Sequence, residues 1–348
     1  MSDRITSPGA GPGDGDEVQL RPRLLHDFIG QKQLRENLRV FVSAARDREE
    51  ALDHVFFSGP PGLGKTTLAA IVANELDVEF RSTSAPALEK TGDLVAILTS
   101  LGRHHVFFID EIHRLRPPIE ELLYTAMEDY EVDVVIGEGP SARTIKISLP
   151  RFTLIGATTK TGLVSAPLYS RFGITARLDL YDQDELEQIV DRTASLLSME
   201  MAPDVRPLLA RSSRGTPRVA IRLVRRMRDY AQVWGDGTLT GAIVDRGLRA
   251  LGIDRYGLDR TDREILSIVI DRYGGGPVGV ETLAISLGET ADTVEDVYEP
   301  FLVQSGFLKR TARGRVVTDL AVRHVRGAAG DQEGGDQEGT GASPGLLF

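Results

Sequence analysis

The chain of 348 residues contains no cysteine. Disulfides, thiol nucleophiles, zinc fingers and iron–sulfur clusters are therefore excluded, and the composition fits a reducing compartment. No apolar run approaches the ~18 residues that a membrane span needs. The N-terminal segment also lacks the apolar core of a secretion signal. We therefore expect a cytoplasmic protein without a membrane partner.

Histidine is also scarce, and none of the six histidines has a metal-site spacing such as H-x-x-x-H. The net charge of −10 is concentrated at the ends, because residues 1–18 carry −3 and residues 331–348 carry −4. Both ends are rich in Gly and polar residues and are expected to be disordered tails. The body is thus only slightly acidic, which does not exclude a nucleic-acid partner.

Short apolar runs alternate with helical periods over the first half of the chain. Three runs, at residues 54–58, 106–109 and 152–155, are typical of buried strands. This order predicts an α/β fold with a parallel sheet and crossover helices. Two further β-type runs, at 132–136 and 144–147, flank a Gly-containing turn and predict a β-hairpin inserted before the third strand.

The second half of the chain has a different pattern. Residues 183–255 contain no strand-like run and begin with a composition typical of a helix start, which predicts a small helical domain. Residues 258–326 predict about three helices followed by a basic, β-like segment.

A phosphate-binding motif is present at residues 59–66, GPPGLGKT, which fits G-x-x-x-x-G-K-[ST] between a strand and a helix. Its glycines allow backbone N–H groups to surround phosphate oxygens at a helix N-terminus. We expect Lys65 to reach the β- and γ-phosphates of ATP and the Thr66 hydroxyl to bind Mg²⁺. The nucleotide-binding residues of this motif are Gly62, Gly64, Lys65, Thr66 and Thr67.

Two carboxylates end the next strand, in the sequence VFFIDE at residues 106–111. We expect Asp110 to hold Mg²⁺ and Glu111 to act as the general base that activates a water for attack on the γ-phosphate. The adjacent His113 is expected to pack or cap there and not to serve as the base.

Three further residues complete the expected site. Thr158 follows the strand at 152–155, where a hydroxyl faces the nucleotide crevice of a parallel sheet. It could sense the γ-phosphate or hold the attacking water. Arg171 and Arg218 supply guanidinium groups suited to a phosphate that gains charge during transfer, and Pro217 suits the first turn of a helix.

Together these motifs resemble the AAA+ ATPases, and within them the RuvB family of Holliday-junction branch-migration motors. The resemblance covers about residues 19–326. It rests on "LRPRLLHDFIGQ" from Leu20, "FIDEIHRL" from Phe108, "LIGATTKTGLVSAPLYSRFGI" from Leu154, "SRGTPRVA" from Ser213 and "GFLKRTARGR" from Gly306.

The resemblance implies a domain order. This is a disordered tail at 1–18, a large AAA+ ATPase domain with the hairpin insertion at 19–182, a small helical lid at 183–255, a winged-helix DNA-binding domain at 256–330 and a disordered acidic tail at 331–348. It also implies a hexameric ring around double-stranded DNA at Holliday junctions, with RuvA as partner and RuvC in a larger complex.

The resemblance also assigns residues. It implies nucleotide contacts from Leu20, Arg21, Tyr181 and part of Glu128-Asp129-Tyr130, and a lid contact from Arg218. Arg171 would be the finger that enters a neighbouring subunit's site. RuvA would dock on the hairpin, where Val134 and Ile136 lie on one face. Arg310 and Arg315 would contact DNA. At Ala291 some family members carry a basic residue, and an alanine side chain cannot make the phosphate contact that such a residue makes.

The C-terminal domain can also be considered from its residues alone. Apolar side chains at i, i+3, i+4, i+7 and i+8 from Val294 predict a core-facing stripe, and the rest of that helix is acidic. Phosphates repel an acidic helix, so we expect the basic segment at 309–326 to contact the DNA backbone. The lid carries eight arginines between 206 and 228 without an acid, which favours salt bridges across a subunit interface over DNA contacts.

Two other functions fit parts of the sequence. Another AAA+ remodeller, such as a clamp loader, would share the phosphate site but not the hairpin and the C-terminal domain. A DNA-binding regulator that only switches with nucleotide would not need a positioned base such as Glu111.

Overall fold

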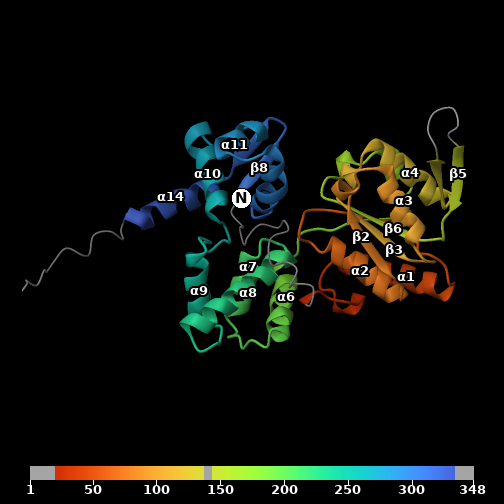
Figure 1. Ribbon diagram of the computed structural model, residues 1–348. Helices are drawn as coiled ribbons and strands as arrows, with labels where there is room; N and C mark the ends of the chain where they lie inside the picture. Colours follow the sequence, from red (N-terminus) through yellow and green to blue (C-terminus); the bar gives the residue numbers. More distant parts are fainter. Residues whose placement is uncertain (1–19, 137–142, 334–348) are drawn as a thin grey trace, which may run out of the picture. The chain divides into compact units, whose positions relative to one another are not determined.

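The computed structural model describes residues 20–136 and 143–333. The expected tail at 1–18, the hairpin turn at 137–140 and most of the tail at 331–348 lie outside the described residues. The described residues divide into two compact units, which separate between Gly247 and Leu248. The first unit holds the sheet and most of the expected lid, and the second holds the C-terminal domain (Figure 1).

A parallel sheet forms the centre of the first unit. In the described residues it has five strands in the order β2-β3-β6-β1-β7. The strands are β1 Val55–Ser58, β2 Phe80–Ser84, β3 Val106–Asp110, β6 Thr153–Thr158 and β7 Ile174–Arg177. β1, β3 and β6 are the three strands that the sequence predicts, and all three are central. The two edge strands, β2 and β7, were not predicted.

Helices cover both faces of this sheet (Figure 1). They are α1 Lys32–Asp47, α2 Lys65–Leu76, α3 Thr91–Ser100, α4 Pro117–Glu128 and the short α5 Ala166–Tyr169. Because side chains alternate along a strand, Phe56, Phe107 and Leu154 share one face, where they pack with Leu94 of α3 and Leu123 of α4. Each of these side chains is fully or almost fully buried, which stabilises the fold by about 1.5–3 kcal/mol per residue.

The predicted hairpin is present between α4 and β6. It consists of β4 Glu131–Ile136 and β5 Arg143–Ser148, paired antiparallel with Val134 opposite Ile145. Val132 is fully buried in the core of the sheet domain, so the base of the hairpin is anchored by apolar packing.

Four helices follow β7: α6 Gln183–Leu196, α7 Val205–Ser212, α8 Pro217–Trp234 and α9 Gly241–Ala250. α6 begins as its sequence indicates, with Asp182 and Glu185 each accepting a hydrogen bond from the other's backbone N–H, at 2.8 and 3.1 Å. Pro217 opens α8 in its first turn. Apart from an isolated β-bridge between Met201 and Leu239, the regular structure described here is helical, as the sequence predicts.

The second unit contains helices and a two-stranded wing. Its elements are α10 Arg260–Tyr273, α11 Val280–Leu287, α12 Ala291–Thr293, a π-helical turn at Val294–Tyr298, α13 Glu299–Gln304, β8 Leu308–Thr311, β9 Gly314–Val317 and α14 Asp319–Glu333. The predicted apolar stripe is confirmed, since Val294, Tyr298 and Leu302 are buried in the core of this unit.

The basic segment at 309–326 differs from its expected form. Only its first part is β-structure, because β9 ends at Val317 and α14 begins at Asp319. The hydroxyl of Thr318 accepts a hydrogen bond from the backbone N–H of Ala321, and Ala321 is fully buried in the core. The interval from Ala321 to the buried His324 suits a helix, which explains why the chain leaves the β conformation here.

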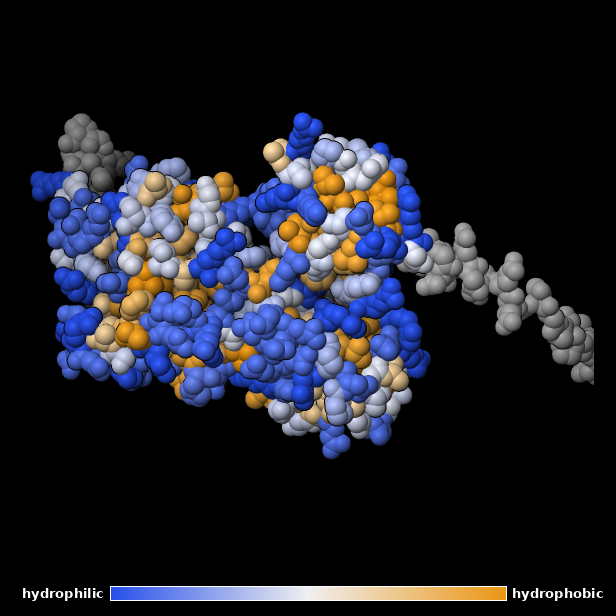
Figure 2. Space-filling view, turned by 180° about the vertical axis from the view of Figure 1, so that it is seen from behind, coloured by the Kyte–Doolittle hydropathy of each residue, from blue (hydrophilic) through white to orange (hydrophobic). Residues whose placement is uncertain are grey.

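Hydrophilic residues cover most of the visible face of the first unit, with smaller apolar patches between them (Figure 2). Among the described residues, no helix is long and apolar enough to cross a membrane.

Candidate functional site

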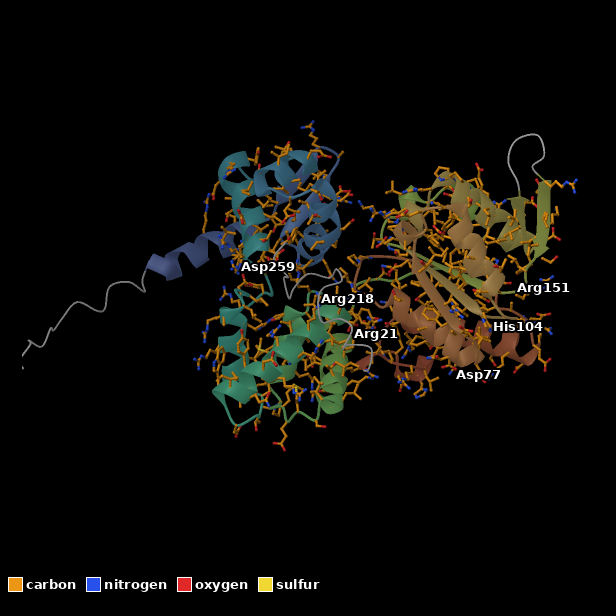
Figure 3. All side chains as sticks on the ribbon, viewed as in Figure 1. Arg21, Asp77, His104, Arg151, Arg218 and Asp259 are labelled. Carbon is orange, nitrogen blue, oxygen red and sulfur yellow. The ribbon has the colours of Figure 1, made fainter. Side chains whose placement is uncertain are left out.

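A pocket in the first unit brings together most of the predicted nucleotide-binding residues. The predicted residues among its lining are Leu20, Arg21, Gly62, Gly64, Lys65, Thr66, Thr67, Asp110, Glu111, Tyr181 and Arg218. Arg21 comes from the segment before α1 and Arg218 from α8, and both are labelled in Figure 3. The pocket thus lies where the carboxyl ends of β1 and β3 meet the lid helices, the usual binding edge of a parallel sheet.

The loop after β1 has a backbone that only glycine adopts readily. Gly62 and Gly64 have φ of 81° and 98°, in the left-handed region. A Cβ on Gly64 would lie 3.2 Å from the ring of Phe28, so the position is also crowded. This geometry turns the loop tightly into the N-terminus of α2, which begins at Lys65.

Lys65 is 7% exposed, and its ammonium group donates to the carbonyl oxygens of Gly59 and Pro60, at 2.6 and 2.9 Å. Burial lowers the pKa of Lys65 to about 8, since it disfavours the charged form. The nearby carboxylates of Glu111 and Asp110 oppose this effect, and the positive Arg218 adds to it. The pKa of this buried ammonium group therefore lies close to neutral pH.

Asp110 ends β3, and its carboxylate accepts a hydrogen bond from the backbone N–H of Glu111 at 3.0 Å. Burial, followed by repulsion from Glu111, raises the pKa of Asp110. Glu111 has φ of 49°, a conformation that is uncommon for a residue with a side chain and that recurs at functional sites.

The other end of the pocket is mainly apolar and joins the lid to the N-terminal segment. Arg192 of α6 donates to the carbonyl oxygen of Leu20 at 2.6 Å. Tyr181 donates from its hydroxyl to the carbonyl of Leu63 at 3.2 Å, and its own N–H bonds to Gly215 at 2.9 Å. Burial raises the pKa of Tyr181, so its hydroxyl stays neutral.

The sequence did not reveal several residues that line the pocket. The lining also includes Phe28, Ile29, Thr159, Ile189, Arg192, Thr193 and Ile221. Phe28 and Ile29 lie inside the "HDFIG" segment on which the resemblance rests, and Thr159 follows Thr158, so local signals for these three existed. Nothing in the pattern of α6 distinguishes Arg192 from any other surface arginine.

Other predicted residues are not among the residues that line the pocket. Thr158 is fully buried and lies behind Thr159, where its hydroxyl is 2.9 Å from Nδ1 of His113. Glu128 is the last residue of α4, and Asp129 and Tyr130 connect it to β4. Their contact with a nucleotide stays a prediction.

Arg171 lies outside the pocket lining of its own chain as well. Its guanidinium carbon is 4.4 Å from the centre of the Tyr124 ring, Nη2 is 3.2 Å from Oε1 of Glu128, and Nη1 donates to Pro167 at 2.7 Å. Its Nε is buried and makes no hydrogen bond within the described residues. Arg171 thus contacts an aromatic face and one carboxylate, and its Nε–H could still donate a hydrogen bond.

Comparisons with known proteins agree along nearly the whole chain. Three family models match in order: the Holliday junction DNA helicase RuvB P-loop domain at residues 20–178, the RuvB AAA lid domain at 181–254 and the RuvB C-terminal winged helix domain at 255–326. The Holliday junction branch migration complex subunit RuvB of Treponema denticola is 57% identical over 97% of this chain and 99% of that protein. The chain belongs to the RuvB family.

Other family members are also similar over most of the chain. The Rubrobacter xylanophilus protein of the same name is 57% identical over 93% of this chain and 91% of its own length. A solved structure, the Holliday junction branch migration motor RuvB of Thermotoga maritima, superposes with a TM-score of 0.82. It is 49% identical over 88% of this chain and 98% of that chain. The fold class expected from the sequence is thereby confirmed.

The apolar face of the hairpin is buried at its base, where Val132 lies, and is partly exposed further along the two strands. Val134 packs partly against the sheet domain, while Ile145, its partner in the register, is 46% exposed. The side chain of Ile136 lies outside the described residues. Ile145 was not among the predicted contact residues, although it stands in the predicted second strand of the hairpin.

The two arginines expected to contact DNA are both bound to glutamates of the preceding helical segment. Arg315 is 8% exposed, and its Nη2 lies 2.9 Å from Glu299 and 2.7 Å from Glu295. Arg310 donates from Nε to Glu299 at 2.6 Å but leaves 57% of its side chain exposed. The backbone of Arg315 also pairs with Val278, at 2.8 and 3.0 Å. Their DNA contacts stay predictions, and Arg315 anchors the wing.

The lowered pKa of Lys65 predicts how ATP affinity changes with pH. Bound phosphates favour the charged ammonium, so binding raises this pKa above its free value of about 8. The Kd for a non-hydrolysable ATP analogue should therefore be constant below about pH 8 and rise by up to tenfold per pH unit above it, by linkage. Isothermal titration calorimetry between about pH 7 and 9.5 measures this.

Lys65→Arg is the control for this titration, because a guanidinium stays charged over the whole range. Its Kd should not depend on pH, whatever its absolute value. An equal pH slope in the arginine variant would assign the titration to another group.

The buried ion pair between Arg315 of the wing and Glu299 of α13 predicts unequal effects of Arg315 and Arg310 on stability. Arg315→Met leaves Glu299, which is 3% exposed, with only one of its two cationic partners, and should destabilise the second unit by about 3 kcal/mol. Arg310→Met removes a half-exposed partner and should cost about 1 kcal/mol or less. Amide hydrogen exchange of α10 and α13 in the full chain measures both losses. Equal losses of protection in the two variants would contradict the anchoring role.

Proposed function

We propose that the chain is an ATP-driven motor that moves double-stranded DNA through Holliday junctions and so drives branch migration, as a hexameric ring with RuvA. The observation that carries this proposal is the pocket that unites Lys65, Asp110, Glu111 and Arg218 between the sheet and the lid. A nucleotide in that pocket touches both parts of the first unit, so a change in its phosphates acts on both.

The residues suit the separate parts of ATP. Lys65 and the N-terminus of α2 neutralise the phosphate charge. The apolar end, with Leu20, Ile29 and Tyr181, suits the base. Arg218 extends from the first turn of α8 into the same pocket, where its charge stabilises the phosphates.

Mg²⁺ fits this site as a companion of ATP. The Thr66 hydroxyl and the Asp110 carboxylate are hard oxygen donors in one pocket. The described part of the chain has no group of three His, Asp or Glu that could hold an ion alone, which suits an ion that takes its other ligands from phosphates and water. When bound, Mg²⁺ neutralises charge on the phosphates.

Hydrolysis follows from the position of Glu111. Its carboxylate accepts a proton from a water whose oxygen attacks the γ-phosphorus. The bond from that phosphorus to the bridging oxygen breaks, and ADP and phosphate leave. The presence of this base favours a motor over a nucleotide-switched regulator, and the family models that match in order do not favour a clamp loader.

The ring is proposed because Arg171 does not line the pocket of its own chain. A neighbouring subunit could receive this arginine at its γ-phosphate, with Glu128, Asp129 and Tyr130 on the same flank. An arginine supplied in this way stabilises the charge of the transition state.

RuvA is proposed to dock on the apolar face of the hairpin, where Val134 and Ile145 lie opposite each other. An exposed apolar surface beside a packed one suits a protein partner. The second unit is proposed to hold DNA through the exposed basic residues of its wing, with Arg310 in contact with phosphates. Phosphate contacts carry no base information, which suits a motor that must move along any sequence.

The Glu111→Gln variant tests hydrolysis as the energy source. The wild-type chain, with RuvA and junction DNA, should hydrolyse ATP and convert the junction into duplex products. Glu111→Gln should bind ATP with unchanged affinity and lose turnover by about 100-fold or more, because the amide cannot accept the proton. Branch migration should fall in parallel. Near-normal turnover in this variant would remove Glu111 from the mechanism.

Mixed rings test the trans role of Arg171. Arg171→Ala and Lys65→Ala subunits should each lose about 10³–10⁵ in rate alone. A mixture should recover part of the activity, because one type of interface then carries both intact groups. The control is Arg177→Ala, an exposed arginine paired only with the exposed Asp179 in the described structure, which should hydrolyse ATP normally. Absence of recovery in rings shown to be mixed would assign Arg171 a role within its own chain.

A further inference from the structure

His113 lies between two groups that ATP hydrolysis needs. It stands in a single 3-10 turn at Ile112–Arg114, directly after Glu111, and its side chain is 9% exposed. Its Nδ1 lies 3.2 Å from Oε2 of Glu111 and 2.9 Å from the hydroxyl oxygen of Thr158 on the neighbouring β6. The adjacent Ile112 is fully buried and fixes the turn against the core.

The hydrogen-bonding capacities of these groups determine which atom carries the proton. A carboxylate oxygen carries only lone pairs, so the 3.2 Å approach of Nδ1 of His113 to Oε2 of Glu111, a close ion-pair distance, is favourable when Nδ1 carries the proton. With its proton on Nδ1, the ring also donates toward Thr158. The hydroxyl oxygen of Thr158 accepts a second bond from the backbone N–H of Lys160, at 3.0 Å. Both of its lone pairs are then used, and its own proton is left to donate to another group.

Two hydrogen-bond donors and the nearby Nδ1 of His113 converge on the same oxygen of Glu111. Besides His113, the backbone N–H and the hydroxyl of Thr159 donate to Oε2, at 3.4 and 3.2 Å. The other oxygen, Oε1, is therefore the one available to bind and deprotonate a water. The left-handed backbone of Glu111 is the local distortion that places the carboxylate between these donors.

We propose that His113 is a positioning residue for hydrolysis: its Nδ1–H holds Oε2 of Glu111 and the buried hydroxyl of Thr158 in fixed positions. This inference rests on the proposed role of Glu111 as the base. The ring acts through the carboxylate and the hydroxyl and does not touch the reacting atoms. It links the carboxylate that activates water, directly after β3, to the hydroxyl of Thr158 on β6.

Two substitutions separate this role from simple packing. His113→Asn places an amide Nδ2 near the position of Nδ1 and keeps a donor, whereas His113→Leu fills a similar space without one. A hydrogen bond to a charged group contributes about 1.5–3 kcal/mol, which corresponds to about 10- to 100-fold in kcat. His113→Leu should lose that factor in kcat, with KM for ATP and Kd for the analogue within about twofold of wild type. His113→Asn should retain kcat within about threefold.

The matched control is His104→Asn, in the loop before β3. His104 has φ of 65°, which asparagine tolerates, and its ring contacts the exposed Arg103, away from the pocket. Its kcat and KM should match wild type. The assays use the full chain with junction DNA and RuvA.

The outcomes are distinct. If His113→Asn loses as much kcat as His113→Leu while both variants still bind ATP, the donor role is wrong. If the leucine variant fails to fold, a loss of 10-fold or more in kcat for a folded His113→Asn variant contradicts the donor role by itself. If His113→Leu raises KM and leaves kcat unchanged, His113 serves binding and the proposal is also wrong. Failure of the proposed function has a different signature, because the wild-type chain would then hydrolyse ATP without moving the junction, or Glu111→Gln would hydrolyse it normally.

Discussion

The ammonium group of Lys65 lies where water can scarcely hydrate it, and the rest of the nucleotide pocket follows from this placement. A buried cation is tolerated only with acceptors and opposite charges close by. The carbonyls of Gly59 and Pro60 supply the acceptors, and Asp110 and Glu111 supply negative charge from the end of β3. Phosphate groups suit this site because they bring further negative charge to Lys65 and Arg218.

In the second unit, the buried charges serve a structural purpose. There Glu299 is neutralised within the chain by Arg315 and Arg310, and the wing is tied to the helical segment through them. The same kinds of side chain thus form a site in one unit and a structural joint in the other. The difference lies in exposure to a ligand, because Lys65 lines a pocket whereas Arg315 is buried against Glu299. A basic sequence pattern alone therefore overstates how many arginines are exposed.

The sequence predicts the parts of the fold that have strong local signals. β1, β3 and β6 were found because both of their faces are buried and they are continuously apolar. β2 and β7, with the sequences FRSTS and ITAR, were missed because edge strands are only partly buried and carry polar residues. The phosphate loop and the paired carboxylates were found because their chemistry demands fixed spacings. Arg192 was missed because its partner is a backbone carbonyl 172 residues away, which leaves no local pattern.

The central claim is that ATP binds with its phosphates at Lys65 and its base between the N-terminal segment and the lid. A structure of the full-length Glu111→Gln chain with bound ATP tests this most directly. We predict that Nζ of Lys65 lies about 3 Å from oxygens of the β- and γ-phosphates. The base should pack among Leu20, Ile29 and Tyr181, and Arg218 should face the phosphates. Phosphates away from Lys65, or a base outside this apolar end, would contradict the account.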